Sequence, residues 1–188
     1  MKNRTLGILA MLGAPFLGIE LLLQHQAHTQ DMRLAGLMGM PYALGWLGCI
    51  WALYRLEAAG SSRNGQAILT IMLFLLSMAN AWNIYAAIDP TANTIVYRIM
   101  DICWPASNLF MVVVGVAVMR ANYWADWRKY VPLAVGFWLP LSVISSLVLG
   151  YESMASVLVC SLYSMIMWTL LGYTIYSTDD SSIQTLSL

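Results

Sequence analysis

The chain is 188 residues long, and 60% of its residues are hydrophobic while only 10% are charged. Average soluble domains carry about 25% charged residues, so this composition excludes an ordinary soluble enzyme and a disordered chain. Nine Lys and Arg residues balance nine Asp and Glu residues, and a chain of zero net charge lacks the basic footprint that nucleic-acid binding requires. The composition predicts an all-α, polytopic membrane protein, with the lipid bilayer as a partner and no nucleic-acid partner.

Six stretches of the sequence are long and apolar enough to form a six-transmembrane-helix bundle. A span needs about 20 mainly apolar residues, so six of them leave no room for an extramembrane domain. We therefore expect a single membrane domain over residues 1–188. Pro15, Pro105 and Pro140 lie inside spans, and we expect each to kink or break its helix. The spans are predicted at residues 5–23, 34–56, 66–88, 97–119, 130–149 and 154–176.

The positive charges predict the orientation of the bundle. If the N-terminus is cytoplasmic, seven of the nine Lys and Arg residues lie on the inner side, and only Arg33 and Arg98 lie on the outer side. Cytoplasmic loops carry an excess of Lys and Arg, which predicts that both termini are inside. The apolar run after Lys2 and Arg4 is longer than that of a signal peptide, so we interpret it as a retained first helix. We expect a multi-pass protein of a bacterial cytoplasmic (inner) membrane.

Two short matches at an offset of 91 residues relate the two halves of the chain. Residues 41–46 resemble residues 132–137, and residues 83–89 resemble residues 174–180. Two units of three spans each would insert in opposite orientations, as in many secondary transporters. The matches raise the hypothesis of a 3+3 inverted repeat. The alternative is chance, because both matching spans start with a proline and small residues recur in membrane helices for packing.

Ionisable and amide side chains gather in the outer half of the predicted bundle. Ionisable groups at membrane depth are costly and normally face a bundle interior or a wet cavity. Glu20 lies near the outer end of the first span, and Asp101 lies near the outer end of the fourth. Asn80 and Asn83 share one face of the third span, and Asn108 lies deeper in the fourth. We predict that these residues form a ligand-binding site.

Pro105 adds a reason to place a ligand near Asp101. The proline ring cannot donate a backbone hydrogen bond and displaces the carbonyl four residues earlier, which is that of Asp101. A carboxylate and a freed carbonyl beside Trp104 would suit a cation or an ammonium group, so Trp104 joins the predicted ligand-binding residues. The alternative is an ion pair between Asp101 and Arg98, three residues earlier, near a helix N-terminus.

The only histidines, His25 and His28, follow Glu20 in the first outer connection. If the first helix continues, Glu20, Gln24 and His28 fall on one stripe, and Glu, His and Asp together can bind zinc or another divalent ion. No H-E-x-x-H or comparable spacing is present, so we interpret the histidines as solvated or in contact with lipid headgroups and predict no metal site. Nucleotide-binding glycine motifs are also missing, and we expect no cofactor.

These observations favour a small transporter or permeation protein with an outward-facing polar site. Glu20 and Asp101 would bind a cation, a proton or an amine-bearing solute, while Asn80 and Asn83 would supply orienting hydrogen bonds. One alternative is a non-catalytic sensor or accessory subunit that binds a lipid, a small ligand or a partner protein. Another alternative is an intramembrane metalloenzyme that uses His25, His28 and Glu20. The sequence does not identify the substrate. It also does not decide whether the protein is an enzyme or whether it forms a homo-oligomer.

Overall fold

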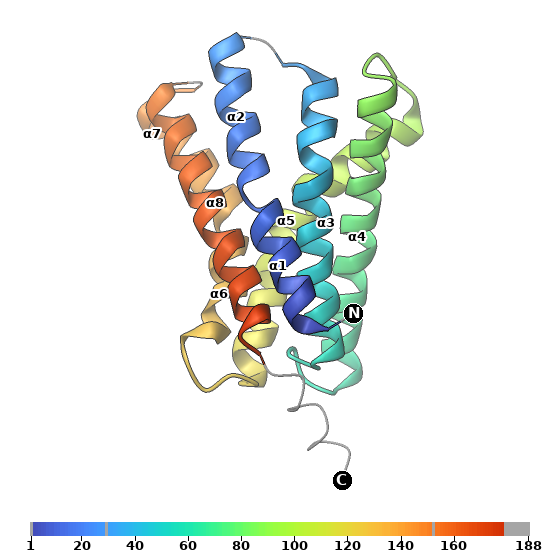
Figure 1. Ribbon diagram of the computed structural model, residues 1–188, viewed down its shortest axis with the longest axis vertical. Coiled ribbons are helices and arrows are strands. Elements are labelled where there is room, and N and C mark those ends of the chain that lie inside the picture. The colour runs from blue at the N-terminus through green and yellow to red at the C-terminus, as the bar shows by residue number, and fades with distance from the viewer. Residues whose placement is uncertain (1, 29, 152, 179–188) are drawn as a thin grey trace.

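The computed structural model describes residues 2–28, 30–151 and 153–178 of the chain (Figure 1). Over these residues the protein is all-helical and contains no β-strand, as the sequence predicts. The helices are α1 (Asn3–Gly13), α2 (Pro15–Ala27), α3 (Met32–Arg55), α4 (Arg63–Ile88), α5 (Ile95–Ala121), η1 (Trp127–Tyr130), α6 (Val131–Gly136), α7 (Trp138–Leu149) and α8 (Met154–Tyr176).

The helices carry the length and apolar composition of membrane spans. Five segments of the described chain qualify, namely α1 with α2, then α3, α4, α5 and α8, and the bent pair of Trp127–Gly136 with Trp138–Leu149 is a sixth if it counts as one span. These segments overlap the six predicted spans. The prediction of a helical membrane protein is therefore confirmed, whereas the number of crossings and their orientation stay predictions.

The segments stand side by side in an elongated bundle (Figure 1). Helix α3 packs on α4, α4 on α5, α5 on α6, and α6 and α7 on α8, while α1 and α2 lie against both α3 and α8. The start of α1 and the end of α8 lie at the same end of the bundle. We term the opposite end, where α2, α4 and α7 end and α3, α5 and α8 begin, the distal end.

Pro15, Pro105 and Pro140, which we expect to kink or break their helices, differ in their effects. Ala14 keeps helical angles (φ −55°, ψ −41°), so α1 and α2 together form one segment of 25 residues. The segment that contains Pro140 bends by 53° between α6 and α7, because a proline nitrogen cannot donate to the carbonyl of Gly136, four residues earlier. Helix α5 runs unbroken past Pro105, so the helix does not break there, and a kink at Pro105 stays a prediction.

The two halves of the chain differ at the segments that the proposed repeat would equate. Helix α3 is continuous from Met32 to Arg55, although it contains Pro41. Its counterpart in the second half is divided into α6 and α7. The inverted repeat therefore stays a prediction.

Glycines let α1 approach its neighbours closely. A Cβ atom at Gly7 would lie 2.6 Å from the carbonyl oxygen of Gly172 on α8, and one at Gly172 would lie 2.9 Å from the carbonyl oxygen of Gly7. On the α3 side, a Cβ atom at Gly45 would lie 2.9 Å from the Cα atom of Ala10. Small residues of this kind are typical of helix crossings in membranes, where close backbone approach replaces the hydrophobic driving force.

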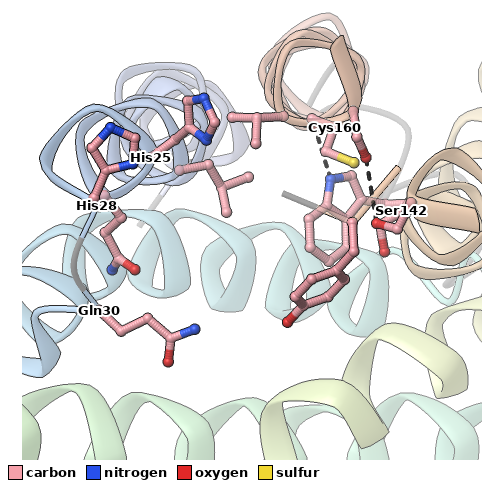
Figure 2. Close-up of a pocket in the computed structure, with 12 residues that line it drawn as sticks. His25, His28, Gln30, Ser142 and Cys160 are labelled. Atoms are coloured by element: carbon pink, nitrogen blue, oxygen red, sulfur yellow. Dashed lines mark hydrogen bonds between the residues drawn. The ribbon is translucent and has the colours of Figure 1, made fainter. Parts of the chain in front are cut away.

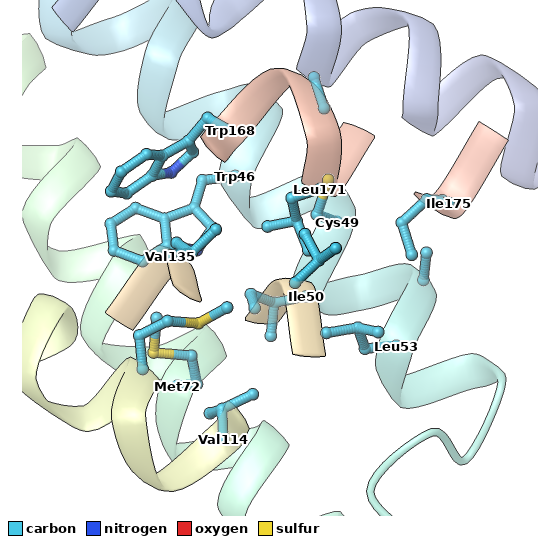
Figure 3. Close-up of a cluster of buried hydrophobic side chains, with 14 of the residues drawn as sticks. Trp46, Cys49, Ile50, Leu53, Met72, Val114, Val135, Trp168, Leu171 and Ile175 are labelled. Carbon is cyan, nitrogen blue, oxygen red and sulfur yellow. The ribbon is translucent and has the colours of Figure 1, made fainter. Parts of the chain in front are cut away.

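Five aromatic side chains meet in the middle of the bundle and form what we term the aromatic cluster. They come from α3, α5, α7 and α8, and the centroid of each ring lies 5.1–6.3 Å from that of the next. Such pairs add about 0.5–1.5 kcal/mol each to the burial of their area. Below them, toward the termini, aliphatic side chains fill the core (Figure 3). The aromatic cluster consists of Tyr42, Trp46, Trp168, Trp138 and Trp104.

Candidate functional site

A pocket of about 440 Å³ lies at the distal end between α2, α3, α4 and α5, and we term it the distal pocket. Both embedded carboxylates that the sequence singles out line it, although they come from helices far apart in the chain. Apolar side chains make up much of the remaining wall. The polar and aromatic residues that line it include Glu20, Gln24, Tyr42, Trp82, Asn83, Tyr97, Asp101 and Trp104.

The two carboxylates of the distal pocket differ in exposure. Glu20, on α2, is half-buried and accepts a hydrogen bond of 3.0 Å from Nε2 of Gln24, one turn further along the same helix. Asp101, on α5, is exposed. No Lys, Arg or His side chain is among the described residues that line this pocket. The described wall therefore holds two carboxyl groups and no cationic side chain that could pair with them.

The alternative interpretation of Asp101, as the ion-pair partner of Arg98, is wrong. Arg98 instead donates from Nε to Oδ1 of Asn93, at 2.9 Å. The ion pair between Arg128 and Asp126 lies at the opposite end of the bundle. A carboxylate that is not committed to an internal ion pair remains available to a ligand.

Aromatic rings surround the carboxylates on two sides. Tyr97, Asp101 and Trp104 follow one another at i, i+4 and i+7, so they share one face of α5. The ring centroids of Tyr97 and Trp82 lie 5.6 Å apart, across the interface of α5 with α4. Tyr42 and Trp104 belong to the aromatic cluster, which lies on the side of the pocket that faces the termini.

Tyr42 also brings a polar atom into the wall of the distal pocket. Its residue is 2% exposed, and within the described part of the chain its hydroxyl has no hydrogen-bond partner. Buried polar atoms in folded proteins nearly always have partners. A ligand in this pocket would give the hydroxyl a partner, which makes Tyr42 a candidate ligand-binding residue.

The three predicted asparagines lie at two depths in the bundle, with Asn83 at the pocket and Asn80 and Asn108 beneath it. Asn83 lines the pocket, where its amide lies against Gly39 of α3, and its Nδ2 donates to Oδ1 of Asn80 at 3.5 Å. Asn80 lies one turn deeper and is buried, and it is not among the lining residues. Asn108 is also buried beneath the pocket and donates to the carbonyl oxygen of Trp104 at 3.0 Å. The structure thus brings four of the six predicted residues to one pocket: Glu20, Asn83, Asp101 and Trp104.

The histidines lie on a second pocket, of about 470 Å³, between α2, α7 and α8 (Figure 2). We term it the serine pocket, because Ser142, Ser146 and Ser156 line it together with His25 and His28. The two pockets share three lining residues and so lie on either side of the distal half of α2. The shared residues are Leu21, Gln24 and Gln30.

The predicted stripe of Glu20, Gln24 and His28 does not form. Helix α2 ends at Ala27, and His28 takes a left-handed conformation (φ 51°, ψ 30°) that leaves the helical stripe. The rings of His25 and His28 are 6.2 Å apart, on the wall of the serine pocket rather than beside Glu20. In the part of the chain that the structure describes, no three His, Cys, Asp or Glu side chains gather as a metal would need. The metalloenzyme alternative is therefore not supported.

The aromatic wall and the serine pocket were not predicted from the sequence. Tyr42, Trp82 and Tyr97 line the distal pocket but were not among the predicted site residues. The spacing of Tyr97 to Asp101 would have identified one of them, because residues four apart share a helix face. No local pattern marks the serine pocket, since it depends on how α2, α7 and α8 come together.

Comparison with known proteins assigns no family to the chain. No family model, no curated protein and no solved structure matches it. Its function must therefore be inferred from the chemistry of the two pockets.

Proposed function

We propose that this chain is a small membrane transporter or permeation protein that binds an amine-bearing cation in the distal pocket. One observation carries the proposal: Glu20 and Asp101 share a pocket with four aromatic rings, and no cationic side chain is among its described lining residues. The faces of Trp and Tyr rings attract cations, and carboxylates within membrane spans mark ion and substrate pathways.

The size and wall of the pocket favour an organic ammonium over a bare metal ion. A Ca²⁺ ion takes about six to eight oxygen ligands at about 2.3–2.6 Å, whereas two carboxylates in a pocket of about 440 Å³ offer far fewer. The apolar and aromatic wall suits the carbon atoms of a solute, as in other small-molecule sites. Asn83 and the hydroxyl of Tyr42 would orient polar groups of that solute.

The filled core beneath the distal pocket supports a second candidate function. Toward the termini, the aromatic cluster and side chains such as Leu76 and Met111, both 0% exposed, fill the bundle. The pocket is therefore closed on that side, and passage of a solute would require the core to open. A sensor or accessory subunit that binds its ligand without passage would need no such opening.

Binding and uptake experiments separate the two functions. The protein in nanodiscs is titrated with benzylammonium and with benzyl alcohol, which has the same ring but no charge. We expect only the cation to bind. Uptake of benzylammonium by reconstituted vesicles would support a transporter, whereas binding without uptake would support the sensor or accessory subunit.

Neutral variants of the carboxylates test the pocket itself. Glu20→Gln should weaken benzylammonium binding by about tenfold or more, because hydrogen bonds to charged groups contribute roughly 1.5–3 kcal/mol. Asp101→Asn should weaken it by less than about fivefold, since Asp101 is exposed and solvent screens its charge. Asp126→Asn, at the other end of the bundle, is the matched control. Unchanged binding in both pocket variants, or equal binding of benzyl alcohol, would refute the proposal.

A further inference from the structure

The serine pocket has a hydroxyl-rich wall that the proposed cation site does not use. The hydroxyl of Ser156, on α8, lies 3.1 Å from that of Ser145 and 3.3 Å from that of Ser146, both on α7. Ser142 adds another hydroxyl one turn earlier on α7. This wall is built by packing α7 against α8. Ser142 and Ser145 donate to backbone carbonyl oxygens of α7, at 2.8 and 3.0 Å, whereas the hydroxyls of Ser146 and Ser156 can turn to donate to a ligand.

The facing wall carries the two histidines. His25 is half-buried on α2, and His28 follows the end of that helix (Figure 2). Histidine is the side chain whose charge ordinarily changes between pH 5 and 8, and imidazolium donates from both ring nitrogens. The first turn of α8, at Ser156 and Val157, also borders the pocket, and the positive end of a helix dipole favours anions.

The two pockets have opposite chemistry. No Asp, Glu, Lys or Arg is among the described residues that line the serine pocket, and its titratable groups besides the histidines are Tyr151 and Cys160. Glu20 lies on the same helix as His25 but lines the distal pocket. Hydroxyl and imidazole donors, with no carboxylate among the described lining residues, suit an oxyanion, and a phosphate group accepts several such hydrogen bonds at once.

We propose that the serine pocket binds the phosphate group of a phospholipid. The position of the pocket favours a lipid as the source of the phosphate, because the pocket lies where α2 and α7 end and α8 begins, which is headgroup depth for helices that span a membrane. Next to it on α7, Leu147 is 80% exposed and Val148 75% exposed, so an acyl chain can lie along this helix. This site is independent of the proposed cation site.

Native mass spectrometry of the detergent-purified full chain tests the proposal. The protein is titrated with phosphatidylglycerol, with diacylglycerol of the same acyl chains, and with inorganic phosphate. We expect phosphatidylglycerol to bind at least about tenfold more tightly than diacylglycerol, because charge-assisted hydrogen bonds to the phosphate are lost in the second lipid. Equal binding of the two lipids would overturn the proposal. Binding of inorganic phosphate that displaces phosphatidylglycerol would show that free phosphate, not a lipid, is the ligand.

Variants locate the binding in the serine pocket. The double variant His25→Gln with His28→Gln should weaken phosphatidylglycerol binding by about tenfold, because it removes the imidazole donors. Ser146→Ala should also weaken it. Ser77→Ala, at an exposed position of α4, is the matched control. Wild-type affinity in both pocket variants, with the same melting temperature as the control, would overturn the assignment.

Discussion

Two glycines one turn apart on α3 offer a sharp test of how α3 and α4 build the distal pocket. A Cβ atom at Gly36 would lie against the carbonyl oxygen of Asn83 and 2.6 Å from the backbone nitrogen of Ala87. The three atoms nearest to a Cβ atom at Gly39 would all belong to the side-chain amide of Asn83, with Cγ at 2.8 Å and Nδ2 at 3.0 Å. The same substitution, Gly→Ala, therefore meets backbone at one position and a rotatable side chain at the other.

The magnitudes follow from these contacts. Ordinary contact begins near 3.4 Å, so Gly36→Ala must move α4 away from α3 by at least about 0.8 Å, the difference from the 2.6 Å contact with Ala87. Overpacking of this kind costs about 1–3 kcal/mol. At Gly39 a rotation of the Asn83 side chain relieves the overlap. Because both variants gain the same helix propensity, about 1 kcal/mol, we expect Gly36→Ala to be less stable than Gly39→Ala by about 1–3 kcal/mol.

Ligand binding should change in the opposite order from stability, so Gly39→Ala should weaken binding more than Gly36→Ala. Gly39→Ala displaces the Asn83 amide from its place in the pocket, and one lost hydrogen bond contributes about 0.5–1.5 kcal/mol. We expect benzylammonium binding to weaken by roughly two- to tenfold, with Asn83→Ala giving a similar loss. The free energy of unfolding in detergent, followed by tryptophan fluorescence, and calorimetric titration measure the two effects. The reasoning is refuted if Gly36→Ala is as stable as Gly39→Ala, or if Gly39→Ala binds like the wild type.

Three further substitutions probe single contacts at the distal end. Tyr42→Phe removes a buried hydroxyl that has no partner within the described residues, so the free energy of unfolding should stay the same or rise, while titration with an amine that carries a hydroxyl should show weaker binding. Gln24→Leu removes the donor to Glu20 and should weaken benzylammonium binding by about 1 kcal/mol in calorimetry; unchanged binding would show that the bond does not orient the carboxylate. Asp31→Ala removes the N-cap of α3, whose side chain accepts from two backbone N–H groups, and should lower the free energy of unfolding by about 1 kcal/mol.

Hydropathy predicts where the helices lie because the cost of exposing a polar backbone to lipid allows few other structures. The predicted span at residues 34–56, for example, corresponds to α3 at Met32–Arg55. The position of a break is harder to predict. Pro105 and Pro140 look alike in the sequence, yet α5 is continuous while the segment of Pro140 bends by 53°. Whether neighbouring helices hold a proline-containing helix together is decided by packing, which no local pattern contains.

The sequence predicts only part of the candidate site, because the rest depends on how the helices pack. Glu20 and Asp101 stand out in the sequence because embedded carboxylates are rare and costly. Aromatic residues do not stand out in a membrane protein, since most of them anchor helices at the interface or fill the core. Trp82 therefore becomes a candidate site residue only once the structure places it in the pocket that contains the two carboxylates. Asn108 shows the converse case, because it lies beneath the pocket and its Nδ2 donates to the carbonyl oxygen of Trp104 on its own helix.

The geometry of α2 explains why the acidic and the imidazole side chains separate rather than meet. Each helical residue turns by about 100°, so His25, five residues after Glu20, points about 140° away from it. A helix that continued through residue 28 would have returned His28 toward Glu20, but the left-handed conformation at that residue directs it elsewhere. The early end of α2 therefore keeps the carboxylate in one pocket and both histidines in the other. Gln24 lines both pockets, so α2 separates a pocket that contains carboxyl groups from a pocket that contains imidazole rings.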